Sequence, residues 1–513
     1  PLTIAIKPDT KRIVIRYNSA PNAAALQWLT PAQTAGKKHP YLFSQGQAIL
    51  NRTWIPTQDS PGIRQTWSAR ITAPEPLKVV MSGERLTPDG EPAGEGRRAY
   101  RFRMDKPVAP YLIAIASGDL AFRELGPRTG VWTEPTMIDR AASELADTER
   151  MVEAAEALYG PYRWGRYDVI VLPPSFPYGG MENPTLTFLT PTFMAGDKSL
   201  VNLVAHELAH SWSGNLVTNA TWADSWLNEG FTSYFENRIM EAIYGQKRAR
   251  QEAALSFDDM AEALKEESND ATTRLHLPPE EATPDGGVTG IVYDKGAAFL
   301  RTIETIVGHD RWDAYLRSYF DRHAFQPMTS ARFLADLREN LVKGDKTLEQ
   351  KLMLDQWVFE PGLPSNVVRA DRAAFAEVDG AISAFAAGSP VPDKFADWTT
   401  AEKIRFINGL PRKLSNGRMA ELDHKLRLNE AGNNEVLFAW LELAVANRYD
   451  PAVPALERFL TTQGRRKFVS PLIEALAEDE QWGKAIASRI YSRARPLYHP
   501  ITTRDLDKLG LGA

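Results

Sequence analysis

Two histidines with three residues between them form the most chemically informative pattern in the sequence. His206 and His210 flank Glu207 in the segment His-Glu-Leu-Ala-His. On a helix with about 3.6 residues per turn, side chains four positions apart project from one face, so both imidazoles can reach one metal ion. Because the chain has no cysteine, a zinc site must use His, Asp and Glu ligands. The segment therefore predicts a zinc-binding helix.

A third ligand follows on a second predicted helix. Glu229 lies in Trp-Leu-Asn-Glu-Gly-Phe, with eighteen residues between it and His210. A structural zinc site needs four protein ligands, whereas a catalytic one keeps a position open for water. Glu207 cannot easily reach the ion that its flanking histidines bind, but it can accept a proton from a water held there. Glu236 falls on the same helix face as Glu229 and is a candidate partner for a ligand. These residues predict metal-assisted hydrolysis of an acyl bond.

A glycine pair precedes the predicted zinc helix. The segment reads Gly179-Gly180-Met181-Glu182-Asn183. Glycines let a backbone approach a ligand closely, and a carboxylate held beside them can pair with a substrate ammonium group. By itself a glycine pair more often marks an ordinary turn, so the segment is a candidate for substrate binding beside that alternative.

The elements that position these residues change along the chain. Residues 1–119 contain short β-branched and aromatic runs, which predict strands at 13–17, 67–71, 78–81 and 99–103. Helical spacing begins at about Met137, inside the second expected domain, residues 120–360, where Asp197 is the expected N-cap of the zinc helix. A Pro- and Gly-rich hinge at 361–373 leads to residues 374–513, where apolar stripes predict packed helix pairs.

Composition limits the class of protein. The 513 residues carry a net charge of −5, which argues against a nucleic-acid partner. No apolar run approaches the roughly 18 residues that span a bilayer. We expect a soluble monomer, in the cytoplasm or an exported compartment, whose N-terminal domain is incomplete in the sequence that begins at Pro1.

Together the motifs resemble the gluzincin zinc aminopeptidases, in the branch that contains leukotriene A(4) hydrolase and aminopeptidase B. Further matching stretches extend the resemblance over essentially the whole chain, and they are residues 39–49, 173–184, 206–219, 226–230, 361–364 and 498–500. The resemblance implies a multidomain α+β protein with a β-sheet N-terminal domain, a thermolysin-like α/β catalytic domain and a layered, solenoid-like α-helical C-terminal domain. It also implies one zinc ion per chain and short peptides as substrates.

The resemblance assigns further roles residue by residue. Glu182 and Gln47 match the positions that hold the free α-amine of the substrate. Tyr293 matches the tyrosine that donates a hydrogen bond to the tetrahedral oxyanion. Arg465 and Lys467 match basic residues that receive the C-terminal carboxylate of a short peptide.

The sequence leaves alternatives open for the substrate and for the activity. Asp285 matches an acidic residue at the rim of the substrate site, which implies a preference for N-terminal arginine, with lysine or alanine tolerated. A second activity of the branch is hydrolysis of a fatty-acid epoxide, but Val288 replaces a tyrosine of that relative. The remaining alternative is a zinc-bearing scaffold without catalysis, against which the intact Glu207 and Tyr293 argue.

Overall fold

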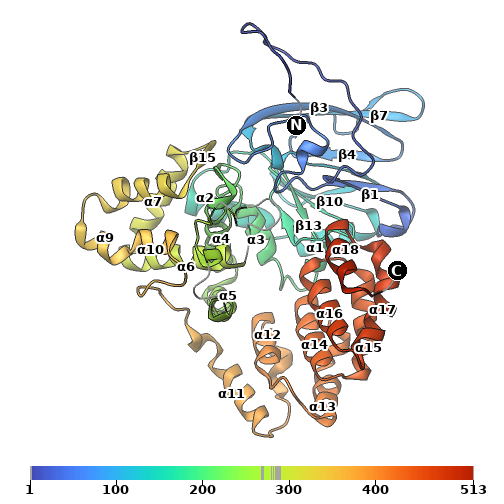
Figure 1. Ribbon diagram of the computed structural model, residues 1–513, viewed down its shortest axis with the longest axis vertical. Helices are drawn as coiled ribbons and strands as arrows, with labels where there is room; N and C mark the ends of the chain where they lie inside the picture. The colour runs from blue at the N-terminus through green and yellow to red at the C-terminus, as the bar shows by residue number, and fades with distance from the viewer. Residues whose placement is uncertain (1–2, 267–270, 279, 281, 283–289, 512–513) are drawn as a thin grey trace.

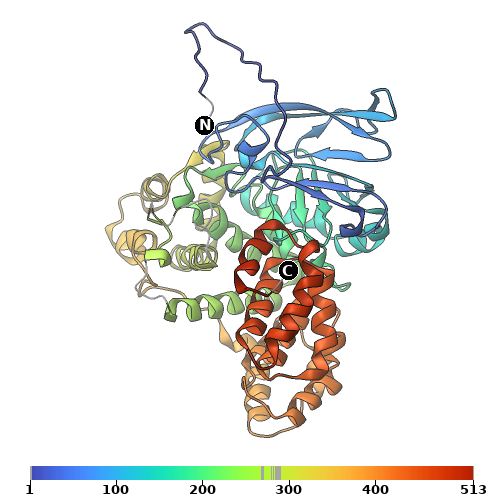
Figure 2. The same ribbon diagram turned by 45° about the vertical axis from the view of Figure 1, so that its right-hand side comes forward.

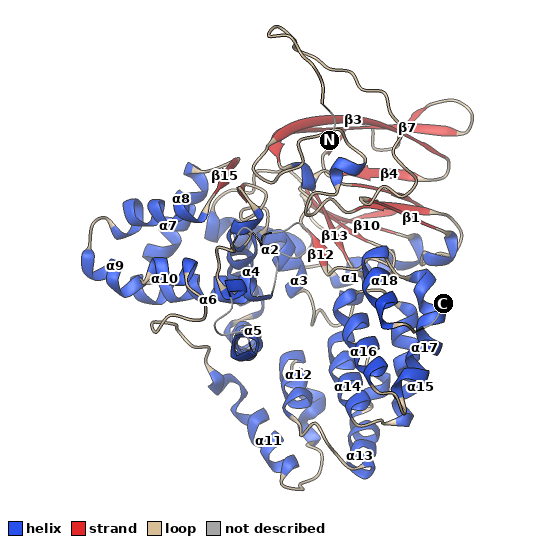
Figure 3. Cartoon of the chain, in the orientation of Figure 1, coloured by secondary structure: helices blue, strands red, loops and turns tan. Residues whose placement is uncertain are grey.

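The computed structural model describes residues 3–266, 271–278, 280, 282 and 290–511. Strands are concentrated toward the N-terminus and helices toward the C-terminus (Figure 3). In two views the C-terminal helices extend away from the central region, and α18 (Pro500–Leu506) lies close to the N-terminal sheets (Figures 1 and 2). Among the described residues, no helix combines the length and hydropathy needed to cross a bilayer.

Two antiparallel sheets form the N-terminal region. The first has the strand order β1 (Leu26–Leu29), β2 (Tyr41–Ser44), β8 (Ile115–Gly118) and β4 (Lys78–Met81). The second pairs β3 (Gln65–Pro74) with β7 (Arg97–Val108), which also pairs with β5 (Glu84–Arg85) and β6 (Glu91–Pro92). The strands predicted at 67–71, 78–81 and 99–103 are confirmed. The strand predicted at 13–17 is wrong, because that exposed segment has no regular secondary structure, and no strand among the described residues pairs with it.

The central region contains a mixed sheet covered by helices. Its strand order is β12 (Gly180–Met181), β13 (Leu186–Leu189), β11 (Tyr167–Val171), β10 (Thr129–Thr133) and β9 (Ala121–Glu124). The three inner strands are parallel and the two outer strands antiparallel. A parallel pair joins β14 (Val217–Asn219) to β15 (Gln326–Met328). The edge strand β12 begins at the second glycine of the pair, and β12 contacts α3.

The central region also contains helices, two of them between β10 and β11 and the others after β13 in the chain. They are α1 (Ile138–Glu144), α2 (Thr148–Tyr159), α3 (Asn202–Ala209), α4 (Trp226–Tyr244), α5 (Gln246–Glu266), α6 (Gly290–Val307), α7 (His309–Arg322), α8 (Ser330–Leu337), α9 (Lys346–Leu352) and α10 (Leu354–Phe359). The N-cap predicted at Asp197 is wrong, because its carboxylate instead accepts the backbone N–H of Ser199 in a turn before α3, and Val201 occupies the cap position.

Helices α4 and α6 pack unusually closely. A Cβ on Gly296 would lie 2.6 Å from the Cα of Gly230, so the two backbones touch where the glycines cross. Next to this crossing, the fully buried Lys295 donates hydrogen bonds of 2.9 Å to the carbonyls of Thr273 and Glu360. Glu360 precedes the linker to the C-terminal region. The position of α6 is therefore fixed both by α4 and by the start of that linker.

The C-terminal region consists of layered helices. They are α11 (Ala376–Ala386), α12 (Thr400–Gly409), α13 (Asn416–Leu426), α14 (Asn434–Ala446), α15 (Val453–Thr462), α16 (Arg466–Glu478), α17 (Gly483–Ala494) and α18. One row runs α12, α14, α16, α18 in contact, and α15 and α17 pack beside it. One hydrophobic core spans both the N-terminal and central regions, whereas the C-terminal helices have a core of their own, which includes Ala254 of α5.

Candidate active site

The three predicted zinc ligands meet between α3 and α4. His206 lies on α3, His210 caps its C-terminal end, and Glu229 lies in the first turn of α4. The Oε2 atom of Glu229 is 3.5 Å from Nε2 of His206 and 3.3 Å from Nε2 of His210. Ligands about 2.05 Å from a tetrahedral zinc ion lie about 3.3 Å apart. Two imidazole nitrogens and a carboxylate oxygen at this spacing fit zinc.

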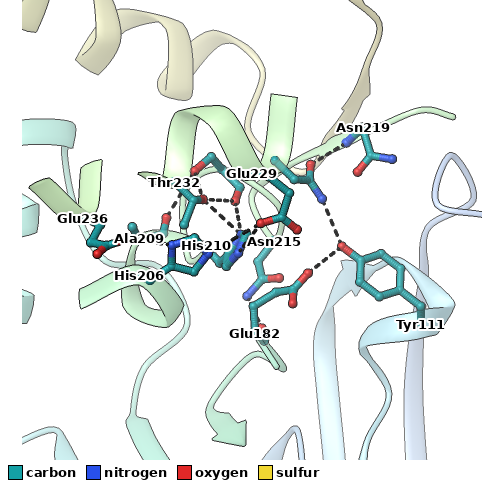
Figure 4. Close-up of polar contacts among 12 residues, drawn as sticks. Tyr111, Glu182, His206, Ala209, His210, Asn215, Asn219, Glu229, Thr232 and Glu236 are labelled. Carbon is teal, nitrogen blue, oxygen red and sulfur yellow. Dashed lines mark hydrogen bonds and ion pairs between the residues drawn. The ribbon is translucent and has the colours of Figure 1, made fainter. Parts of the chain in front are cut away.

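The other ring nitrogen of each histidine has a partner of its own (Figure 4). Nδ1 of His206 lies 2.9 Å from Oε2 of Glu236, whose second oxygen accepts a 3.0 Å hydrogen bond from Asn202. Nδ1 of His210 lies 2.8 Å from the carbonyl of Ser213. Because both partners are acceptors, each Nδ1 carries the proton and each Nε2 keeps its lone pair for a metal. The placement of Glu236 agrees with its predicted role.

Glu207 lies against Gly180, the first residue of β12. Its side chain is buried, and a Cβ on Gly180 would come within 2.2 Å of its Oε1 atom. The site therefore requires glycine at position 180, because any larger residue would displace the carboxylate. Burial raises the pKa of Glu207 to about 7, against the opposing charges of His206 and His210. A carboxyl group with this pKa can accept a proton and later release it near neutral pH.

Glu182 is held by a chain of hydrogen bonds (Figure 4). The hydroxyl of Tyr111 donates to its Oε1 at 3.1 Å, and Nδ2 of Asn228 donates to that hydroxyl at 3.2 Å. Nδ2 of Asn215 donates to the Glu182 carbonyl at 2.7 Å. Sequence reasoning missed these three residues. Asn228 and Asn215 fall inside the matching motifs, whereas Tyr111, in an apolar run, gave no signal.

Two glutamines from the N-terminal region border the same space. Gln47, predicted to hold the substrate amine, is half-buried and lines the cleft together with Glu182. Gln45, which sequence reasoning did not single out, is buried and donates a 3.3 Å hydrogen bond to the sulfur of buried Met181. Met181 therefore supports Gln45.

Tyr293 stands beside the predicted zinc ligands in the first turns of α6. Its ring stacks on that of His206 with centroids 5.9 Å apart. Burial and the nearby carboxylates of Glu229 and Glu182 raise the pKa of its phenol well above the ordinary value. The phenol therefore stays protonated and can donate a hydrogen bond. The contact between Gly230 and Gly296 places this tyrosine relative to Glu229.

A cleft of about 1490 Å³ connects these groups with all three regions. Its walls include Gln47, Gly179, Gly180, Glu182, His206, Glu207, His210, Glu229, Glu236, Tyr293 and Arg465. The structure thus brings most of the predicted site residues into one space, from segments more than 400 positions apart.

The two predicted carboxylate-binding residues differ in position. The Arg465 guanidinium lies against Gly179, where a Cβ would approach it to 2.9 Å, and it contacts Glu435 at 3.4 Å. Lys467 is about half exposed and pairs with the other side of Glu435 at 2.8 Å, outside the cleft walls. Arg465 therefore faces the substrate space and Lys467 reaches it through Glu435. Asp285 and Val288 lie outside the described residues.

Comparison with known proteins agrees with this geometry. The Peptidase family M1 domain matches residues 143–357, the Peptidase M1 N-terminal domain matches 5–112, and the domain described as leukotriene A4 hydrolase, C-terminal, matches 398–509. The chain is 35% identical to leucine aminopeptidase 2 of Yarrowia lipolytica over 98% of this chain and 80% of that protein. It is also 35% identical to leukotriene A-4 hydrolase of Xenopus laevis, over 96% of this chain and 82% of that protein.

A solved structure extends the likeness to three dimensions. Yeast LTA4 hydrolase in complex with bestatin superimposes with a TM-score of 0.86 at 32% identity, covering 96% of this chain and 81% of that one. This chain is a member of peptidase family M1, a family of zinc-dependent enzymes. Within it, the chain is a metalloaminopeptidase with a C-terminal domain of the leukotriene A4 hydrolase type. The predicted family and three-domain α+β architecture are confirmed.

Proposed function

We propose that this enzyme releases the first residue of short peptides with a free N-terminus, using one zinc ion held by His206, His210 and Glu229. The observation that carries the proposal is the position of Glu182. Ligand atoms of Glu182, Glu207 and His210 all lie within 4.8 Å of one another. A substrate ammonium paired with Glu182 therefore leaves only the first peptide bond within reach of Glu207, which explains removal of one residue at a time.

The side chains around this point have complementary tasks. When bound, zinc supplies a Lewis acid that polarises a carbonyl group and lowers the pKa of water. Glu207 accepts the proton of the attacking water and delivers it to the leaving amine. Tyr293 donates its phenolic hydrogen to the developing oxyanion. Glu182 and Gln47 hold the ammonium group of the substrate.

Residues outside the reacting centre select the length and the N-terminal residue of the substrate. Arg465 binds the C-terminal carboxylate of a tripeptide, with Lys467 sharing its partner Glu435. We propose a preference for N-terminal arginine, with Asp285 as the acidic partner of that side chain. Replacing Asp285 with asparagine should then lower the ratio of kcat/KM for arginyl over alanyl substrates, and an unchanged ratio would exclude this role.

The proposal is tested with an arginyl tripeptide and the purified protein. Hydrolysis should disappear after chelation and return when zinc is added. Glu207→Gln should bind one equivalent of zinc while kcat falls by about 100-fold or more. Arg465→Ala should impair the free tripeptide far more than an arginyl anilide, which has no carboxylate. One bound zinc without any peptide hydrolysis would refute the proposal and favour a zinc-bearing scaffold.

A further inference from the structure

The cleft does not end at Arg465. Its lining also includes Tyr178, next to the glycine pair, and residues of α16 and α18. The part of the cleft lined by these residues is called the distal cleft below, and its residues are Tyr178, Arg466, Pro500, Ile501, Arg504 and Asp505. The mechanism proposed above uses none of these side chains.

Residues 178–182, which contain the glycine pair, mark successive positions along the cleft. Glu182 lies at the amine end, Gly180 lies against Glu207, and Gly179 lies against Arg465. Tyr178 comes next along the chain. An extended peptide advances about 3.3 Å per residue, as a strand does. Each residue of a bound peptide therefore lies beside about one residue of segment 178–182. A tripeptide whose amine is at Glu182 then ends near Arg465, and a tetrapeptide ends near Tyr178.

Two arginines surround Tyr178. The backbone N–H of Arg466 donates a 2.8 Å hydrogen bond to the carbonyl of Pro177, which ties the start of α16 to this segment. Burial raises the pKa of the Tyr178 phenol, and the positive charges of Arg466 and Arg504 oppose that shift. Both guanidinium groups therefore act on the same part of the distal cleft.

The charges of these arginines are not equally available. Arg466 pairs with Asp505 at 2.5 Å, which neutralises much of its charge. Arg504 is exposed, and its charge acts on the carboxylate of Asp505, but among the described residues it forms no hydrogen bond and no ion pair within 4.0 Å. An exposed arginine lining a peptide cleft presents a planar donor group that matches a carboxylate.

We propose that Arg504 binds the C-terminal carboxylate of tetrapeptides, so that the cleft holds two carboxylate anchors in series, Arg465 for tripeptides and Arg504 for peptides one residue longer. The proposal rests on the aminopeptidase function proposed above and extends its substrate class. Arg466 contributes positive charge to the same position, but its ion pair with Asp505 neutralises part of that charge. Arg504 is therefore the main binding partner for the carboxylate of a tetrapeptide.

The test compares an arginyl tetrapeptide as the free acid and as the C-terminal amide, which differ only in the carboxylate. The wild-type enzyme should prefer the acid. In Arg504→Ala the ratio of kcat/KM for acid over amide should fall about tenfold, mainly through KM, because one charge-assisted hydrogen-bonding partner is lost. Arg504→Lys should restore part of the preference. The control is Arg489→Ala, which removes an exposed arginine of α17 that does not line the cleft, and it should leave the ratio unchanged.

Two results would overturn the inference: equal treatment of acid and amide by the wild-type enzyme, or the same ratio in Arg504→Ala as in the wild type. Failure of the aminopeptidase function is recognised separately, because the zinc-loaded wild type would then hydrolyse no peptide. In that case, calorimetry measures binding of the tetrapeptide acid and amide to the zinc-loaded Glu207→Gln variant, with and without Arg504→Ala. This comparison still tests whether Arg504 binds the carboxylate. Tighter binding of the acid that is lost with Arg504 supports the anchor, and equal binding excludes it.

Discussion

Replacing Gly180 with alanine should disable the enzyme without unfolding it. The new Cβ would lie 2.2 Å from Oε1 and 2.4 Å from Cδ of Glu207. Non-bonded carbon atoms settle at about 3.5 Å or more, so the carboxylate must retreat by about 1 Å. A displacement of about 1 Å costs about 100-fold in rate, which corresponds to about 2.7 kcal/mol of transition-state stabilisation. We therefore expect kcat/KM to fall by about two orders of magnitude.

The assay is steady-state hydrolysis of an arginyl tripeptide by zinc-loaded protein, with zinc content and thermal unfolding measured on the same samples. Gly380→Ala is the control, because a Cβ on that glycine of α11 would meet no atom within 4 Å. Gly180→Ala should bind zinc as the wild type does, since the three atoms nearest to the new Cβ all belong to Glu207 and none to a zinc ligand. Wild-type kcat/KM in Gly180→Ala would refute the argument that this glycine sets the position of Glu207.

Two further predictions concern residues around the site. Glu236→Ala removes the acceptor of His206 Nδ1 and should weaken zinc binding by about tenfold in a competition titration with a chelator. The control is Glu153→Ala, on the exposed face of α2, which should leave zinc affinity unchanged. Equal zinc affinities of Glu236→Ala and the wild type would contradict the role of Glu236 as a partner of His206. Burial lowers the pKa of Lys295 to about 7, so between pH 7 and about 10.4 the unfolded chain binds more protons and the free energy of unfolding rises with pH. Lys295→Met should flatten that rise in denaturant titrations, and an unchanged slope would exclude the effect.

The sequence was sufficient to predict residues whose chemistry depends on local spacing. His206, Glu207 and His210 share about one helical turn, and their relative positions follow from the helix itself. Glu229 required only a second helix nearby. The change from strand-rich to helix-rich sequence also followed from the hydrophobic period, because strands and helices bury different sets of positions. The three-domain architecture was implied by the family resemblance.

Other features depend on contacts that no local pattern encodes. Tyr111 supports Glu182 from 71 positions away, and its surroundings read as ordinary core. The segment 13–17 has the alternation of a strand, but a strand exists only where a second strand accepts its hydrogen bonds. The close approach of Gly180 to Glu207 is likewise a tertiary fact, although the glycine pair itself was visible.

The contact between Gly230 and Gly296 has a consequence for how this enzyme can change. Glu229 precedes one glycine directly, and Tyr293 lies three residues before the other. The separation between the ligand carboxylate and the phenol is therefore set by two main chains in contact, which no exchange of side chains elsewhere can readily adjust. Residues of α16 and α18 also line the cleft, and their side chains can change without moving these two main chains. We therefore expect differences in which peptides are accepted to arise on those helices rather than at Glu229 or Tyr293.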